Sequence, residues 1–109
     1  MSKFIIGAAL VAAAAGFPAS ANAQSADTSL GKHLAETVCS ACHQTDKDAS
    51  GPGPNPAAPS FLAISRRPSM SDLAIKVFLR SSHPTMPNII LSPEEIDSLT
   101  AYIRSLSNK

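Results

Sequence analysis

The chain has 109 residues, with nine basic and eight acidic side chains and a formal net charge of +1. This nearly neutral balance argues against nucleic acid or an anionic membrane surface as a strong partner. A chain of this length builds one small domain, and domains of this size often need a covalent link or a cofactor for stability.

The N-terminal segment, residues 1–23, is predicted to be a cleaved signal peptide. Lys3 provides a positive charge, the 12 residues 4–15 are apolar, and residues 21–23 are Ala-Asn-Ala, a small-x-small cleavage pattern. The alternative is a membrane anchor, but the apolar run is shorter than the roughly 20 residues that span a bilayer. We therefore expect a mature domain of residues 24–109 in the periplasm, a compartment that permits disulfides, without stable membrane insertion.

Three stretches of the mature domain are predicted to be helices. Residues 29–41 carry apolar side chains at helical spacing. Residues 69–82 begin with serines and an aspartate that resemble a capping box. The third helix begins after Ser92, with Pro93 at its first position and Glu95 completing a Ser-x-x-Glu capping box. No convincing strand accompanies them, so the predicted fold class is all-α.

A long loop is predicted between the first two helices, over residues 44–60. Four prolines and two glycines lie between positions 51 and 59. Neither a helix nor a central strand tolerates this density of prolines. A loop of this length is unusual in a small domain unless it wraps around something.

The only two cysteines lie in the motif Cys39-Ser40-Ala41-Cys42-His43. Helical spacing places the two thiols about one turn apart, so that each thiol can form a thioether with one vinyl group of a haem. The adjacent His43 then provides a ligand to the iron. C-x-x-C-H is the signature expected for c-type haem attachment.

Other chemistries share part of this motif. A thioredoxin-type dithiol is the strongest alternative, although it expects a βαβ pattern that the sequence lacks. A structural zinc site requires four ligands, and His33 and His83 do not have the spacing of paired zinc fingers. A disulfide between Cys39 and Cys42 would close a very small loop and stabilise the fold little.

The sixth ligand of a haem iron has four candidates in this sequence. Met86 is preferred because it lies in a short loop flanked by two prolines, which lower the conformational entropy lost when one thioether is presented to the iron. His83 is the nearest rival, and bis-histidine ligation would lower the reduction potential. Met70 is expected to pack at the start of the second helix, and His33 is expected at the surface.

These motifs resemble those of the small class I c-type cytochromes of bacteria, over nearly the whole mature chain. Gly31 stands eight residues before Cys39, where that family has a glycine at the crossing of its first and last helices. Leu99 and Tyr102 fall where the last helix would meet this glycine. The resemblance implies a small cytochrome c-like fold, with about three helices and their loops around one covalent haem c.

Two further segments resemble functional segments of the same family. Residues 58–61 (Ala-Pro-Ser-Phe) resemble the proline segment, in which the Pro59 carbonyl would accept a hydrogen bond from His43. Residues 84–88 (Pro-Thr-Met-Pro-Asn) resemble the methionine loop. An apolar shell around the haem is expected from Leu34, Val38, Phe61, Leu62, Phe78, Ile89, Leu99 and Ile103.

The sequence departs from the family pattern in two places. The insertion at residues 51–56 is unusual, and the chain has no tryptophan, which often binds the haem propionates in this family. Arg66 and Arg67 are candidates for that contact, as charge-assisted donors. Two solvated loop arginines are an equally good interpretation.

The resulting functional prediction is a periplasmic one-electron carrier with His43 and Met86 as axial ligands and no enzymatic turnover of its own. A monomer with transient redox partners as donor and acceptor is expected. The alternatives are a small cytochrome subunit of a dehydrogenase or oxidase complex, and a haem gas sensor or peroxidase with an open sixth position. The haem-free dithiol oxidoreductase remains a further alternative.

Overall fold

The computed structural model describes residues 13–17, 26–48, 51–81, 83 and 85–107. Within these ranges the chain is helical and has no strand, which confirms the predicted all-α class. The elements are α1 (Thr28–Thr37), the 3-10 helix η1 (Cys39–Ala41), α2 (Phe61–Arg66), α3 (Asp72–Arg80) and α4 (Pro93–Ser105). Apart from residues 13–17, the predicted signal peptide lies outside the described residues.

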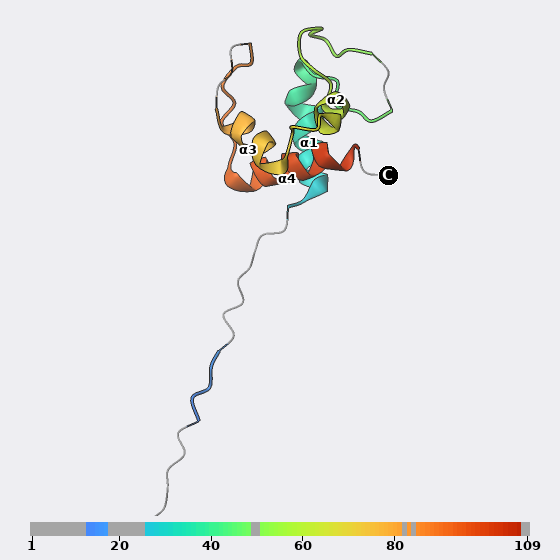
Figure 1. Ribbon diagram of the computed structural model, residues 1–109. Coiled ribbons are helices and arrows are strands. Elements are labelled where there is room, and N and C mark those ends of the chain that lie inside the picture. The colour runs from blue at the N-terminus through green and yellow to red at the C-terminus, as the bar shows by residue number, and fades with distance from the viewer. Residues whose placement is uncertain (1–12, 18–25, 49–50, 82, 84, 108–109) are drawn as a thin grey trace, which may run out of the picture.

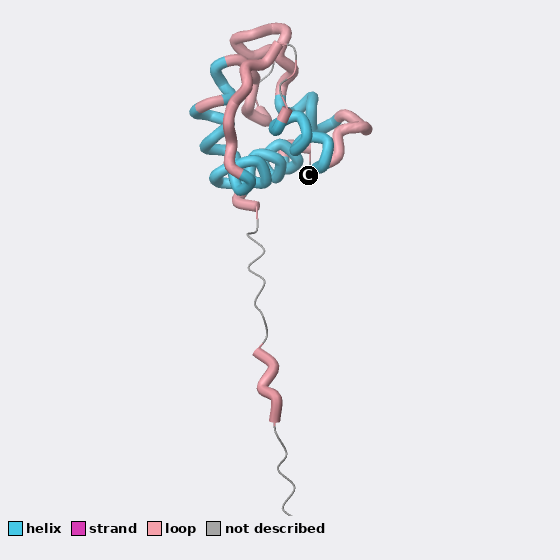
Figure 2. Tube along the Cα trace, turned by 90° about the vertical axis from the view of Figure 1, so that its left-hand side faces the viewer, coloured by secondary structure: helices cyan, strands magenta, loops and turns pink. Residues whose placement is uncertain are grey.

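Helix α4 forms the base on which the other three α-helices pack (Figure 1). Helices α1, α2 and α3 each contact α4, and the described loop residues 44–48 and 51–60 extend away from it on the side of α2. Figure 2 shows that loops make up much of the remaining fold. The helices therefore form one side of the domain, and long loops enclose the other.

Each α-helix begins at a side chain that caps it. Asp27 accepts hydrogen bonds from two backbone amides of the first turn of α1, and Ser60 and Ser71 accept one each at the starts of α2 and α3. At α4 the Ser92 and Glu95 side chains form both halves of the predicted capping box, which is confirmed. The second predicted helix is shorter than expected, because its cap is Ser71 and not a residue near position 69.

The first predicted helix, residues 29–41, is divided in the structure. Helix α1 ends at Thr37 and the tighter helix η1 follows. Near this break the Thr37 hydroxyl donates to the carbonyl of His33, and the Ser40 hydroxyl donates to the carbonyl of Glu36. Hydroxyl groups that bond to carbonyls one turn back compete with the regular helical pattern and bend the chain.

Helix α2 was not predicted from the sequence. Its six residues are too few to show a helical period, and a proline-rich loop precedes it. Ser60 accepts a hydrogen bond from the amide of Ala63, and Phe61 is buried in the core. The helix therefore depends on its cap and on burial.

The core lies between α4 and the elements packed on it. Its apolar side chains are Ala35, Cys39, Phe61, Ile75, Leu99, Tyr102, Ile103 and Leu106. At the crossing of α1 and α4, a Cβ on Gly31 would clash with the Ser98 carbonyl and lie 2.8 Å from the Tyr102 Cβ. The predicted crossing at Gly31 is confirmed, with Ser98, and not Leu99, as the nearest residue of α4 besides Tyr102.

Among the residues described here, none of the helices has the length and apolar character needed to cross a membrane.

Candidate functional site

A cavity of about 290 Å³ lies between the loops and the helices. Its wall includes Cys39, Cys42, His43, Pro59 and Met86, the five site residues that the sequence predicts. They come from three separate segments: η1 and the two residues after it, the segment before α2 and the loop before α4. The fold thus brings together residues up to 47 positions apart in the sequence, from 39 to 86.

The two cysteines and His43 are held together by local hydrogen bonds. The amides of Cys42 and His43 both donate to the carbonyl of Cys39, at 3.1 and 2.9 Å. Cys39 is buried, whereas Cys42 is half-buried. Burial raises the pKa of the Cys39 thiol to about 11, so this side chain is a neutral thiol at pH 7.

The imidazole of His43 is oriented from the far end of the long loop. Its Nδ1 atom lies 2.7 Å from the carbonyl oxygen of Pro59. A carbonyl oxygen only accepts, so this contact requires a proton on Nδ1 and leaves Nε2 as the basic ring nitrogen. The Phe61 ring packs on the imidazole at a centroid distance of 5.3 Å. His43 is therefore fixed in both tautomer and orientation.

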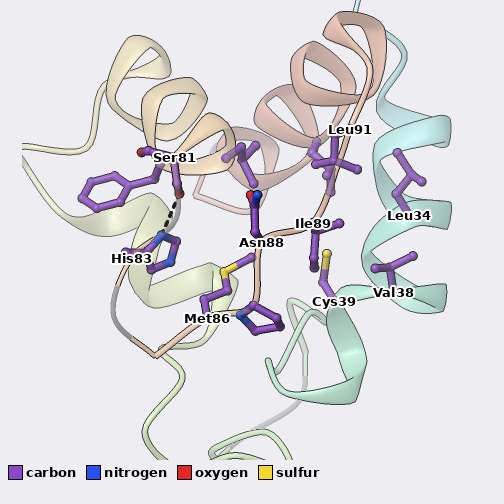
Figure 3. A pocket seen from close by; sticks show the side chains of 13 residues that line it. Leu34, Val38, Cys39, Ser81, His83, Met86, Asn88, Ile89 and Leu91 are labelled. Atoms are coloured by element: carbon purple, nitrogen blue, oxygen red, sulfur yellow. Dashed lines mark hydrogen bonds between the residues drawn. The ribbon is translucent and has the colours of Figure 1, made fainter.

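Met86 lies in the loop that precedes α4 and lines the same cavity as His43. This loop forms a turn in which the Met86 amide donates to the carbonyl of His83, at 3.1 Å. The Met86 and His83 side chains line the main cavity, and both also line a smaller cavity of about 20 Å³, shown in Figure 3, that shares part of its wall. Pro84, part of the predicted methionine loop, lies outside the described residues.

The ring of His83 has one polar contact and one aromatic contact. Its Nδ1 atom lies 3.3 Å from the Ser81 carbonyl oxygen, and its ring packs edge-on against Phe78 at 5.5 Å. His33 is exposed on α1 and lines neither cavity, as expected of a surface residue. Met70 lines the main cavity and is half-buried.

The walls of the cavities are mainly apolar. Seven of the eight predicted shell residues line one or both of them, and Leu62 packs against the core instead. Sequence reasoning missed Asn55, Ile64, Ile75 and Leu79, which also line the main cavity or the adjoining one. Ile64 lies on α2, which was not predicted, and Ile75 is the buried residue of α3.

Charge is sparse around the main cavity. Among the lining residues that the structure describes, Arg67 alone carries a permanent charge. Arg66, the other predicted donor, is exposed at the end of α2 and is not part of the wall. The structure therefore distinguishes two arginines that are neighbours in the sequence.

The alternatives for the cysteine motif find little support in this geometry. Cys39 and Cys42 are not joined by a disulfide. In the part of the chain that the structure describes, no group of three or more His, Cys, Asp or Glu side chains is placed to hold a metal ion. The described ranges also contain no strand for a βαβ unit. Instead, two thiols, an oriented imidazole and a thioether line one apolar cavity, which is a donor set suited to haem c.

Comparison with known proteins also supports a haem c site. Residues 28–107 match the sequence profile of a family described as Cytochrome c. This range includes every residue of the cavity wall. Searches of curated proteins and of solved structures gave no match.

Proposed function

The chain belongs to the cytochrome c family, and from this premise we propose that it is a periplasmic electron carrier with His43 and Met86 as the axial ligands of its haem iron. The family carries a covalently attached haem c, so haem c with iron is the cofactor, and electron transport with redox partners is the family's role. Bound haem supplies a one-electron Fe(III)/Fe(II) couple.

One observation carries the proposal: Cys39, Cys42, His43 and Met86 all line the same apolar cavity. The two cysteines would hold the haem through thioether bonds, in which each Sγ adds to one vinyl carbon and the thiol proton passes to the other carbon. His43 would bind the iron through Nε2, because Nδ1 is engaged by Pro59.

Met86 is favoured as the second axial ligand over His83. Both line the cavity. The Nδ1 of His83 contacts the Ser81 carbonyl and its ring packs on Phe78, which leaves Nε2 available as at His43, so these contacts do not separate the two candidates. Met86 is preferred because the prolines at positions 84 and 87 lower the conformational entropy lost when its thioether is presented to the iron. Thioether ligation together with histidine raises the reduction potential. Two protein ligands leave no open position for a substrate, so we propose no enzymatic turnover.

The cellular setting belongs to the same proposal. Residues 1–23 would direct export and be removed, leaving residues 24–109 as a monomeric mono-haem domain in the periplasm. This domain has eight basic and eight acidic side chains, because Lys3 is lost with the signal. Contacts with a donor and an acceptor would be transient, without strong electrostatic steering.

A redox titration of the exported protein, followed by visible spectroscopy, tests the proposal. We expect one haem per chain by mass spectrometry, attached at both cysteines, and a low-spin spectrum in both oxidation states. A high-spin ferrous haem that binds carbon monoxide readily would contradict the carrier function. Co-purification with a larger dehydrogenase or oxidase would favour the subunit alternative.

A further inference from the structure

The unusual Gly/Pro loop lies directly against the haem-attachment motif. Three consecutive residues, 42–44, are each hydrogen-bonded to this loop or to the segment that follows it. The amide of Asn55 donates to the Cys42 carbonyl at 3.1 Å, and the amide of Phe61 donates to the Gln44 carbonyl at 2.9 Å. Between them, the Nδ1–H of His43 donates to the Pro59 carbonyl at 2.7 Å. We call residues 53–61 the clasp.

Gly53 is where the clasp comes closest to the motif. A Cβ at this position would clash with the amide nitrogen of Gln44 and would lie 2.5 Å from the carbonyl carbon of His43 and 2.8 Å from the Cys42 oxygen. All three are backbone atoms, which cannot move aside as the end of a flexible side chain would. Only a residue without a side chain allows this approach.

Gly51, two residues earlier, is a glycine for a different reason. Its φ is +99°, a conformation that residues with side chains rarely adopt, and nothing lies within 4 Å of a Cβ placed on it. The two glycines are therefore required for different reasons, one conformational and one steric. Gly51 permits a backbone conformation, and Gly53 permits a contact.

Prolines restrict the part of the chain that carries this contact. Residues 52, 54 and 56 are prolines that alternate with Gly53 and Asn55. Their fixed φ angles reduce the conformational entropy that the loop loses when it orders. They also remove backbone donors, so that the Asn55 amide is the donor in this stretch that reaches the motif.

We propose that the clasp is a positioning device for the axial histidine, with Gly53 as its positioning residue. The inference rests on the proposed function, because His43 is assigned as the iron ligand there. By fixing the backbone of residues 42–44 against Asn55 and Phe61, the clasp holds the imidazole at the Pro59 carbonyl. That hydrogen bond increases electron donation by the histidine and stabilises Fe(III). Loosening the clasp therefore raises the reduction potential.

The test compares Gly53→Ala with Gly51→Ala in the haem-loaded protein. Two quantities are measured by redox titration and by NMR: the midpoint potential and the rate at which the Nδ1–H of His43 exchanges with solvent. We expect Gly53→Ala to raise the potential and to accelerate this exchange at least tenfold. Gly51→Ala should leave both at their wild-type values, even if it lowers the melting temperature. Wild-type values in Gly53→Ala, or the same change in both variants, would overturn the clasp.

A measurement on the wild-type protein keeps the inference testable if Gly53→Ala yields no haem-loaded protein. Amide exchange should be slow at Asn55 and Phe61, whose amides donate to the motif, and fast at Gly53, whose amide has no acceptor among the described residues. Fast exchange at Asn55 and Phe61 would contradict the clasp whatever binds the iron. A wild-type spectrum without histidine ligation would instead overturn the proposed function, so the two failures are distinct.

Discussion

Gly31 of α1 lies in direct backbone contact with Ser98 of α4. A Cβ on Gly31 would clash with the Ser98 carbonyl oxygen and lie 2.6 Å from its carbon. The Ser98 hydroxyl also accepts a hydrogen bond from the Asp27 amide at 3.1 Å, beside the same crossing. This contact sets how closely the first helix, and η1 after it, approach the base of the fold.

We predict that Gly31→Ala destabilises the protein by about 1–3 kcal/mol, the usual cost of overpacking a close contact. Glycine to alanine in a helix otherwise stabilises by about 0.5–1 kcal/mol through propensity. The sign of the change in the free energy of unfolding therefore separates steric crowding from propensity. Denaturant unfolding of the haem-loaded variant measures it, and an unchanged or raised stability would contradict the close crossing.

Met86→Leu should remove the thioether ligand while conserving side-chain volume. We expect an altered haem spectrum and a lower midpoint potential, by a fraction of the roughly 0.8 V range that axial ligands span. Met70→Leu is the matched control, because Met70 lines the same cavity and is not assigned to the iron. An altered spectrum for Met70→Leu and a normal one for Met86→Leu would reverse the assignment. A low-spin, low-potential Met86→Leu protein that becomes high-spin on adding His83→Ala would identify His83 as the substitute ligand.

Tyr102→Phe should reduce stability at pH 7 by about 1–3 kcal/mol, because the buried Thr45 carbonyl loses its donor. In the native protein the Tyr102 hydroxyl donates to this carbonyl at 2.8 Å. Denaturant unfolding at several pH values measures both this loss and the effect of titration described next.

Burial raises the pKa of the Tyr102 phenol above its ordinary value of 10.0, and the carboxylates of Asp46 and Glu36 raise it further. The unfolded state then releases this proton at lower pH than the folded state. Wild-type stability should therefore fall as the pH rises above about 10, and Tyr102→Phe should lack this contribution. Parallel stability curves for the two proteins above that pH would contradict the raised pKa.

Arg104→Ala should cost more stability than Asp72→Asn. The Arg104 side chain donates to the carbonyls of Ser65 and Met70 at 3.3 and 3.2 Å, and its Nε lies 3.0 Å from the Asp72 carboxylate. The ion pair is exposed, at 37% for Arg104 and 68% for Asp72, and such pairs contribute about 0–1 kcal/mol. We expect a loss of about 2 kcal/mol for Arg104→Ala and less than 1 kcal/mol for Asp72→Asn. Equal losses in thermal or denaturant unfolding would show that the ion pair dominates.

Electron transfer to an acidic or a basic acceptor protein should depend only weakly on ionic strength. The proposed mature domain has equal numbers of acidic and basic side chains, eight of each, so long-range steering is weak. Stopped-flow rates between low and high salt measure this dependence. A fall of tenfold or more would reveal a concentrated charged docking patch.

The sequence by itself determined the features that depend on residues close together in the chain. The cysteine and histidine spacing in residues 39–43 specifies the haem-attachment chemistry, and Ser92 with Glu95 specifies the start of α4. Both are local: side chains a few positions apart must meet once the backbone adopts a helical turn. The prolines around residues 51–59 likewise exclude regular structure there.

Only the tertiary structure decided which distant residues meet. It places Arg67 and not Arg66 in the cavity wall, the Ser98 carbonyl closest to Gly31, and a short helix where no period was visible. It also gives the 53–61 segment a contact with the haem-attachment motif. These outcomes depend on backbone atoms and side chains that pack across long separations in the chain, where shape and close contact, and not residue type, select the partner.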